Sequence, residues 1–247
     1  MKLRAGFFDF TGCEGCQLAV LHLEQGFLDL TAVMDVVEFR EVMTARGGEL
    51  DVAFVEGSIS SAEQEARLRD IRRRSRLLVA LGACADTGGV NALAGAHEPA
   101  ELARTVYGSD APVRTFGFGR ARPVSAVVRV DARVPGCPVD GEEFLRVLQA
   151  LALGRIPLLP AYPVCVECRL AELPCVFEKG ELCLGPVVRA GCGARCPGGG
   201  DRCRGCRGLV DNPRESAYRN VLEEHGLTEE DMLAEYRVFN LSTGGGR

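Results

Sequence analysis

The stretch LRAGFFDFTGCEGCQL, residues 3–18, joins an apolar run to a turn that carries two cysteines. The run at 3–10 is short and largely apolar, which is typical of a strand buried on both faces of a parallel sheet. The turn TGCEGC, residues 11–16, has the CxxC spacing found in redox dithiols, in zinc sites and in iron-sulfur sites. Its position directly after the first strand indicates a functional edge of the sheet.

The same succession of apolar strand, turn and helix continues to about residue 155. It predicts an α/β fold in which a parallel sheet is covered by helices on both faces. Beyond the first strand, the expected elements are strands at 33–39, 51–57 and 76–83, and helices at 16–27, 60–75 and 141–154. Ser60 or Ser61 is suited to cap the second helix, and an apolar stretch at 124–138 precedes the last one.

The composition is that of a folded protein without the charge of a nucleic-acid binder. Of 247 residues, 47% are hydrophobic and 26% are charged, which suffices for a substantial core. The net charge of −5 argues against nucleic acid as a partner, because phosphate recognition normally requires a basic face. The N-terminus lacks the apolar run of a signal peptide, and no stretch is long enough to span a membrane. We therefore expect a cytoplasmic protein whose twelve cysteines are metal ligands or reactive thiols rather than disulfides.

The composition changes after Pro157 and divides the chain into an α/β domain, residues 1–156, and a C-terminal domain, residues 157–247. Residues 160–210 are rich in Cys, Gly, Pro and Arg and show little periodicity, so no ordinary hydrophobic core is expected to hold them. Bound metal is the expected substitute, because ligation energy becomes folding energy. A helical tail follows at 225–239, with Thr228 as its N-cap.

Four cysteines, here called the N-terminal set, lie at or just after the ends of predicted strands. In a doubly wound sheet the loops at the carboxyl ends of the strands converge on one edge. Three separate loops would therefore gather four thiolates there, and their glycines would let the backbone approach an inorganic cluster closely. The members of the N-terminal set are Cys13, Cys16, Cys84 and Cys137.

The remaining eight cysteines form two consecutive groups of four, each of which contains the CxxC spacing of tetrahedral thiolate sites. Structural zinc and an iron-sulfur cluster both fit either group taken alone. Zinc fits the N-terminal set poorly, because structural zinc usually staples a small module rather than distant loops of a stable sheet. The 165–183 set comprises Cys165, Cys168, Cys175 and Cys183, and the 192–206 set comprises Cys192, Cys196, Cys203 and Cys206.

The chain resembles the small, or delta, subunit of cytosolic nickel-iron hydrogenases of the sulfhydrogenase and NADP-linked class. The resemblance is carried by GFFDFTGCEGCQL, VAFVEGSIS, LLVALGACADTGGV and PGCP, then by PVCVECRL, CLGPVVRAGC, ARCPG, CRGCRG and the tail HGLTEEDMLAEYRVFN. It implies a flavodoxin-like doubly wound domain followed by a small irregular iron-sulfur domain. It also implies three 4Fe-4S clusters: a proximal one on the N-terminal set, a distal one on the 165–183 set and a medial one on the 192–206 set.

The same resemblance implies an electron-transfer function. The nickel-iron site would lie on a large subunit, and the clusters would relay electrons between that site and a flavin or iron-sulfur, NAD(P)-linked partner. No residue of this chain is expected to be catalytic. Two alternatives stay open: a subunit similar to the cluster-bearing small subunit of respiratory complex I, and a non-catalytic interaction module stabilised by zinc.

Several charged residues have roles that the sequence leaves open. Glu14 lies inside the first CxxC loop without an identifiable partner, and Glu56 ends a predicted strand, where it could bond to backbone amides or shape the proximal site. A basic cluster near the last cysteines is either a positive field or docking edge or an ordinary solvated loop. Its members are Arg189, Arg195, Arg202, Arg204 and Arg207, and Asp201 is the single acid among them.

Overall fold

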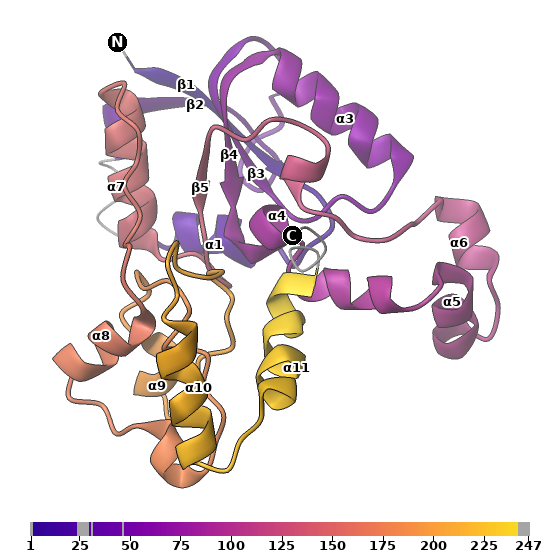
Figure 1. Ribbon diagram of the computed structural model, residues 1–247. Helices are drawn as coiled ribbons and strands as arrows, with labels where there is room; N and C mark the ends of the chain where they lie inside the picture. Colours follow the sequence, from indigo (N-terminus) through magenta and orange to yellow (C-terminus); the bar gives the residue numbers. More distant parts are fainter. Residues whose placement is uncertain (1, 24–29, 31, 46, 242–247) are drawn as a thin grey trace.

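Five parallel strands form one sheet in the order β2-β1-β3-β4-β5 in the computed structural model, which describes residues 2–23, 30, 32–45 and 47–241 (Figure 1). This is the strand order of flavodoxin, so the predicted doubly wound α/β class is confirmed. The strands are β1 (Leu3–Asp9), β2 (Met34–Phe39), β3 (Leu50–Glu56), β4 (Ser75–Leu81) and the short β5 (Ala132–Val134).

The helices follow the expected succession and add several short elements that the sequence did not predict. In the first part of the chain they are α1 (Gly15–Leu21), α3 (Ala62–Arg73), α4 (Gly82–Thr87), η1 (Val90–Ala96), α5 (Pro99–Tyr107), α6 (Ala111–Phe116), η2 (Val124–Ala126) and α7 (Gly141–Ala152). In the last part they are α8 (Val164–Leu170), η3 (Val176–Lys179), α9 (Arg195–Gly198), α10 (Glu215–Glu224) and α11 (Glu229–Asn240). The helix predicted at 16–27 ends earlier than expected, since α1 stops at Leu21 and His22 is its C-cap; residues 24–27 lie outside the described residues.

Both faces of the sheet are buried, because side chains alternate along each strand. On β1, Phe7 points to the face covered by α1 and α7, where its ring stacks at 4.5 Å from Phe39 and 4.9 Å from Phe54. Phe8 points to the opposite face and packs in the core with Leu68 of α3. Ser61 caps α3 by accepting a hydrogen bond from the Gln64 N–H, as predicted. The two cores hold the sheet rigidly and thereby fix the loops at its carboxyl edge.

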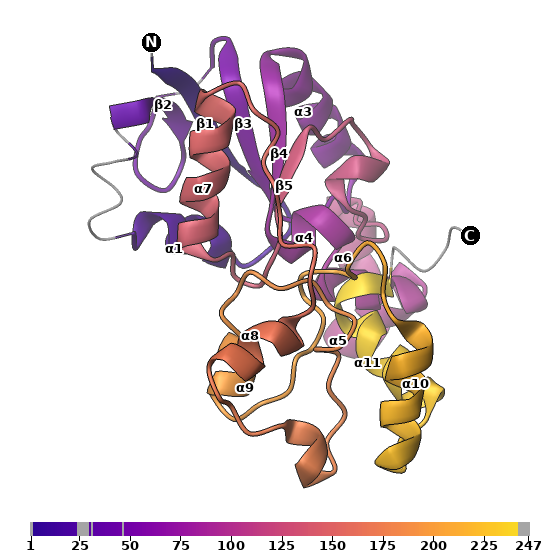
Figure 2. The same cartoon turned by 60° about the vertical axis from the view of Figure 1, so that its left-hand side comes forward.

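The C-terminal part of the chain packs below that carboxyl edge (Figure 2). The expectation that it lacks an ordinary hydrophobic core is wrong. Val164, Phe177, Leu184 and Val188 are buried together with side chains of α10. The reason is that Tyr218 and Leu222 of α10 come from beyond the cysteine-rich segment and complete a core that this segment could not form alone. The same core includes Cys183 and Cys203.

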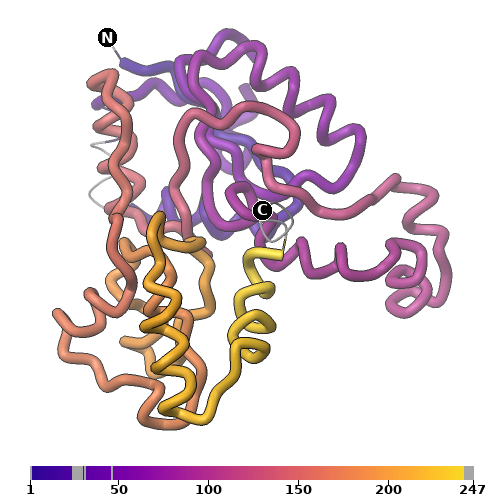
Figure 3. Tube along the Cα trace, in the orientation of Figure 1, coloured from indigo at the N-terminus to yellow at the C-terminus, as the bar shows by residue number. Residues whose placement is uncertain are grey.

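Helix α11 returns from the C-terminal part to the sheet and packs against η1 and α4 (Figure 3). Thr228 caps it in a capping box with Asp231, which confirms the predicted N-cap. At its other end, the Thr87 hydroxyl of α4 donates a hydrogen bond to the Phe239 carbonyl at 2.6 Å. The described helices are all too short or too polar to cross a bilayer.

Candidate metal centres

The N-terminal set lies where the sheet topology leads us to expect it. Helix α1, which contains Cys16, begins after β1, and α4, which contains Cys84, begins directly after β4. Cys13 precedes α1, and Cys137 follows β5. The sheet changes winding direction between β1 and β3, and ligands of such folds bind outside the carboxyl ends of the strands at this point. The cysteine loop after β1 lies on one side of it.

The four thiols of this set influence one another electrostatically. Burial raises the pKa of the Cys84 thiol to about 12, and the nearby charges of Cys137 and Cys13 act in the same direction. Burial also raises the pKa of Cys16, to which the charges of Glu56, Cys137 and Cys84 contribute. Thiols in such surroundings resist ionisation unless a cation compensates the charge. The cysteines of the three loops thus lie close enough at the sheet edge to influence one another.

Two glycines of the site are required by close contacts with sulfur. Gly82 has a φ of +83°, and a Cβ there would lie 2.3 Å from the Cys16 Sγ. Gly89 has a φ of +58°, and its Cβ would lie 2.8 Å from the Cys84 Sγ. Both positions combine a left-handed backbone with a lack of space, so only glycine is accommodated. The backbone therefore approaches the sulfurs as closely as a cluster-binding loop requires.

Glu56 at the end of β3 fixes the start of the cysteine helix. Its side chain is buried, and its two carboxylate oxygens accept hydrogen bonds from the N–H groups of Cys16, at 3.0 Å, and Gln17, at 2.8 Å. Burial raises the pKa of Glu56, and the bonds from these amides oppose that effect. Glu56 therefore bonds to backbone amides and, because one amide belongs to Cys16, also shapes the site.

Replacing Glu56 with glutamine is expected to loosen this turn, because the glutamine NH₂ group would face an N–H donor. Losing one such charged hydrogen bond costs about 2 kcal/mol, which corresponds to a fall of several degrees in the thermal midpoint. Thermal unfolding of the anaerobically purified chain measures this change. Glu142→Gln, at an exposed position on α7, is the matched control. Equal midpoints in the two variants would contradict the role assigned to Glu56.

Glu14 has a partner that the sequence did not reveal. Its carboxylate accepts a hydrogen bond from Nη2 of Arg40 at 2.7 Å, and Nη1 of Arg40 lies 3.1 Å from Asp9. Arg40 thereby holds the loop of Cys13 against the end of β2. Glu14 has a φ of 61°, a left-handed conformation that lets the loop turn into α1.

The 165–183 set surrounds the start of α8. Burial raises the pKa of Cys165 to about 12, with further contributions from the charges of Cys183, Cys168 and Cys175. The Cys183 Sγ accepts hydrogen bonds from the N–H groups of Gly185, at 3.4 Å, and Cys203, at 3.3 Å. Such amide donors stabilise thiolate sulfur. Cys175 is exposed, so one side of this set reaches the surface.

The 192–206 set lies between the other two. Burial raises the pKa of Cys206 to about 12, and the charges of Cys192, Cys137 and Cys196 influence it further. Cys137 belongs to the N-terminal set, so these two sets are neighbours. On the other side, the N–H of Cys203 bonds to Cys183, and the charge of Cys192 contributes to the raised pKa of Cys168. The 192–206 set therefore has neighbours in both other sets.

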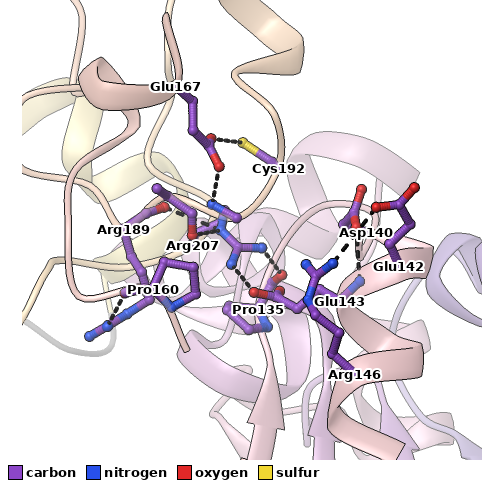
Figure 4. A network of polar contacts seen from close by, with 12 residues as sticks. Pro135, Asp140, Glu142, Glu143, Arg146, Pro160, Glu167, Arg189, Cys192 and Arg207 are labelled. Carbon is purple, nitrogen blue, oxygen red and sulfur yellow. Dashed lines mark hydrogen bonds and ion pairs between the residues drawn. The ribbon is translucent and has the colours of Figure 1, made fainter. Parts of the chain in front are cut away.

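Glu167, inside the CxxC spacing of the 165–183 set, is a residue that sequence reasoning missed. Its carboxylate accepts hydrogen bonds from the N–H groups of Gly191, at 2.7 Å, and Ala194, at 3.0 Å, on either side of Cys192. Figure 4 shows the same carboxylate directed at the Cys192 Sγ, which lies 3.9 Å from its Oε2. Glu167 thus fixes the backbone around Cys192 with its carboxylate, as Glu56 fixes the backbone at Cys16. The CxxC spacing itself gives no signal for this contact, which joins residues more than twenty positions apart.

The basic cluster is not a simple solvated loop, because two of its arginines are buried. All five arginines are paired with acids: Arg189 with Asp211, Arg195 with Asp140, Arg202 with Glu181 and Glu235, Arg204 with Asp201 and Glu235, and Arg207 with Glu143. Arg189 and Arg207 are buried. One arginine still exerts a positive field on a cysteine: the charge of Arg207 lowers the pKa of Cys192, whereas burial raises it.

An apolar groove lies beside the N-terminal set and was not predicted from the sequence. Helices α5 and α6 project from the sheet (Figures 1 and 3) and border a groove of about 850 Å³. Tyr107, Phe116 and Phe118 line it and are exposed. Asn91 at its inner end lies 3.7 Å from the Cys84 Sγ, so the groove continues to the edge of the site.

The three cysteine sets can be compared with the requirements of zinc and of a four-iron cluster. A zinc site needs its four sulfurs at ~2.3 Å from one ion. In the part of the chain that the structure describes, no three His, Cys, Asp or Glu side chains converge on a position for a single ion. A four-iron cluster is held by four thiolates, one on each iron. Close glycines and amides donated to sulfur, both present here, suit such a cluster.

Comparisons with known proteins agree with this arrangement. A family model described as NADH ubiquinone oxidoreductase, 20 Kd subunit, matches residues 13–151. Sulfhydrogenase 2 subunit delta of Pyrococcus furiosus is 39% identical over 240 residues, which cover 96% of this chain and 99% of the relative. The NAD-reducing hydrogenase HoxS subunit delta of Cupriavidus necator is 29% identical over 177 residues, covering 65% and 83%. A crystal structure of an NAD+-reducing NiFe-hydrogenase in the H2-reduced state aligns with a TM-score of 0.59 and 31% identity, over 65% of this chain and 96% of that one.

The fold and the cysteine sets are those of an electron-transferring oxidoreductase subunit. The chain belongs to the family of the small subunits of nickel-iron hydrogenases, within the wider family of the 20 Kd subunit. The predicted resemblance is therefore confirmed. The 20 Kd model ends before the eight C-terminal cysteines, whereas the sulfhydrogenase relative aligns over nearly the whole chain. This difference favours the hydrogenase subunit over the complex I-like alternative.

Proposed function

We propose that this hydrogenase subunit relays electrons through three 4Fe-4S clusters, held in order by the N-terminal, 192–206 and 165–183 sets. One observation carries the proposal: the 192–206 set neighbours both others. Cys206 lies beside Cys137, and the backbone N–H of Cys203 donates a hydrogen bond to the Cys183 Sγ. Clusters bound there would each take up and release one electron. The chain's own residues supply the ligands, the amide donors and the burial that tune such a potential.

The exposed edge of the N-terminal set is the proposed contact with the large subunit that carries nickel and iron. Cys13 and Cys137 are exposed in this chain, and the apolar groove of α5 and α6 continues from the same edge. A partner there would exclude water from the site and cover exposed aromatic side chains. All twelve cysteines are assigned to the three sets, which leaves none to hold a nickel-iron site.

Exposed Cys175 indicates where electrons would leave the chain. We propose that a flavin or iron-sulfur, NAD(P)-linked subunit docks near the 165–183 set. We also propose that residues 1–156 and 157–247 act as two units, one for the proximal site and one for the other two. The cytoplasm remains the proposed compartment, since the thiols must stay reduced to bind iron.

The order of the relay is tested by removing its middle member. In the complex with its native large subunit, the double variant Cys192→Ala/Cys206→Ala is expected to lose about four irons. Hydrogen should then still reduce the proximal cluster but no longer the distal one, as followed by electron paramagnetic resonance (EPR). Cys175→Ser is the matched control, in which hydrogen still reduces the proximal and medial clusters. Reduction of the distal cluster at the wild-type rate in the double variant would refute the proposed order.

A further inference from the structure

A buried ion pair joins the loop of Cys206 to helix α7. Arg207 directly follows Cys206, and its Nη2 donates a hydrogen bond to the Glu143 Oε1 at 2.7 Å. The two side chains are 1% and 3% exposed. Glu143 lies in the first turn of α7, which belongs to the α/β part of the chain. The pair therefore crosses from the cysteine-rich part of the chain to the helix that covers the sheet (Figure 4).

The remaining donors of the guanidinium bind backbone next to two other ligand candidates. Nη1 donates to the Pro135 carbonyl at 2.7 Å, and Pro135 precedes Cys137 by two positions. Nε donates to the Ala190 carbonyl at 2.9 Å, and Ala190 precedes Cys192 by two positions. The Arg207 side chain thus fixes three segments relative to one another: the start of α7, the segment before Cys137 and the segment before Cys192. The last two segments belong to different cysteine sets. Only the forked, planar guanidinium can serve three such acceptors at once.

The chain leaves room for this pair at one specific position. Gly191 has a φ of +115°, and a Cβ there would lie 2.3 Å from the Arg207 Nη2 and 2.6 Å from the Glu143 Oε1. Any other residue at 191 would displace the pair. The ion pair therefore packs directly against the backbone of the loop that carries Cys192.

The charge of Arg207 acts on the 192–206 set at close range. Arginine stays protonated in proteins, and the Glu143 Oε1 lies 2.7 Å from the Arg207 Nη2. The guanidinium therefore stays charged. Because the pair is dry, its field is screened far less than that of an exposed arginine.

We propose that Arg207 and Glu143 form a positioning pair that fixes the medial site against the proximal site and sets the reduction potential of the medial cluster. The inference rests on the proposed function, since it requires clusters on both sets. One-electron reduction adds one negative charge to a cluster, so a nearby positive charge raises its potential and a nearby negative charge lowers it. Glu143 offsets part of the effect of Arg207.

The test uses the anaerobically purified full chain and its variants Glu143→Gln, Arg207→Gln and Arg207→Lys. Midpoint potentials come from titration with dithionite monitored by EPR, which also reports the magnetic interaction between the reduced proximal and medial clusters. Glu143→Gln should raise the medial potential, because the arginine loses its counter-charge, and Arg207→Gln should lower it. Arg207→Lys keeps the positive charge but loses the forked guanidinium that binds several acceptors. The reduction potential of the medial cluster should therefore stay unchanged, while the magnetic interaction between the two clusters changes. Arg195→Gln is the control, because Arg195 directly precedes Cys196 of the same set but its side chain is 61% exposed.

Opposite shifts in Glu143→Gln and Arg207→Gln, both larger than in Arg195→Gln, support the inference. A purely structural pair would give shifts of the same sign, and that result would overturn it. If Arg207→Gln does not fold, Glu143→Gln must still raise the potential and Arg207→Lys must leave it in place; any other combination overturns the inference. Failure of the wild-type chain to bind three clusters would instead count against the proposed function.

Discussion

Replacement of Cys84 by serine is expected to remove about four of about twelve irons and to stop electron flow through the chain. Cys84 lies on α4, near Cys13 and Cys137, and a Cβ added at Gly89 would lie 2.8 Å from its sulfur. A serine hydroxyl is a poor ligand for iron at neutral pH, and the sheet holds the position so firmly that no other thiol can move in. The medial and distal clusters should remain, because their ligands come from a separate segment.

Iron analysis and EPR spectra of the anaerobically purified variant measure this loss. Thr87→Ser is the matched control, since Thr87 lies on the same short helix and serine keeps the hydroxyl that bonds to Phe239. The control should retain all of its iron. Selective loss of the two C-terminal clusters in Cys84→Ser would show that the cysteines are grouped incorrectly.

The second large effect is the absence of hydrogen turnover by the isolated chain. Uptake and evolution of hydrogen should both be undetectable until the large subunit is added, because the three sets account for every cysteine of the chain. Hydrogen-dependent reduction of a dye, by the chain alone and after reconstitution, measures this difference. Turnover by the chain alone would mean that it holds a catalytic centre of its own.

Crosslinking of the reconstituted complex examines the orientation of the partner. The large subunit is expected to contact the groove at Phe116 and the edge at Cys13 and Cys137, where apolar and sulfur-bearing side chains are exposed together. A contact restricted to α11 would contradict the proposed orientation.

The sheet and the placement of the N-terminal set could be predicted from the sequence because both depend on local signals. Apolar runs such as 3–10 and 51–57 are strands in any environment that buries both faces. Parallel strands connected by helices have their carboxyl ends on one edge, so cysteines that follow strands meet there. The N-caps Ser61 and Thr228 could likewise be predicted, since a cap bonds only to residues of the first helical turn.

The contacts that join the cysteine sets could not be predicted, because they depend on residues far apart in the chain. The pairing of Arg207 with Glu143 spans 64 positions, and the bonds of Glu56 to the turn at Cys16 span 40. A cluster of arginines in sequence therefore looked basic although each arginine has an acidic partner in space. The core of the C-terminal part was missed for the same reason, since Tyr218 and Leu222 arrive from α10.

The metal content of the anaerobically purified wild-type chain decides whether it holds a relay of three clusters. Expressed with intact cluster assembly, the chain should be brown and contain about twelve irons and about as many acid-labile sulfides. Its EPR spectra after stepwise reduction should show three clusters that interact in sequence. A colourless chain with zinc in place of iron, or with iron at the N-terminal set alone, would contradict the relay.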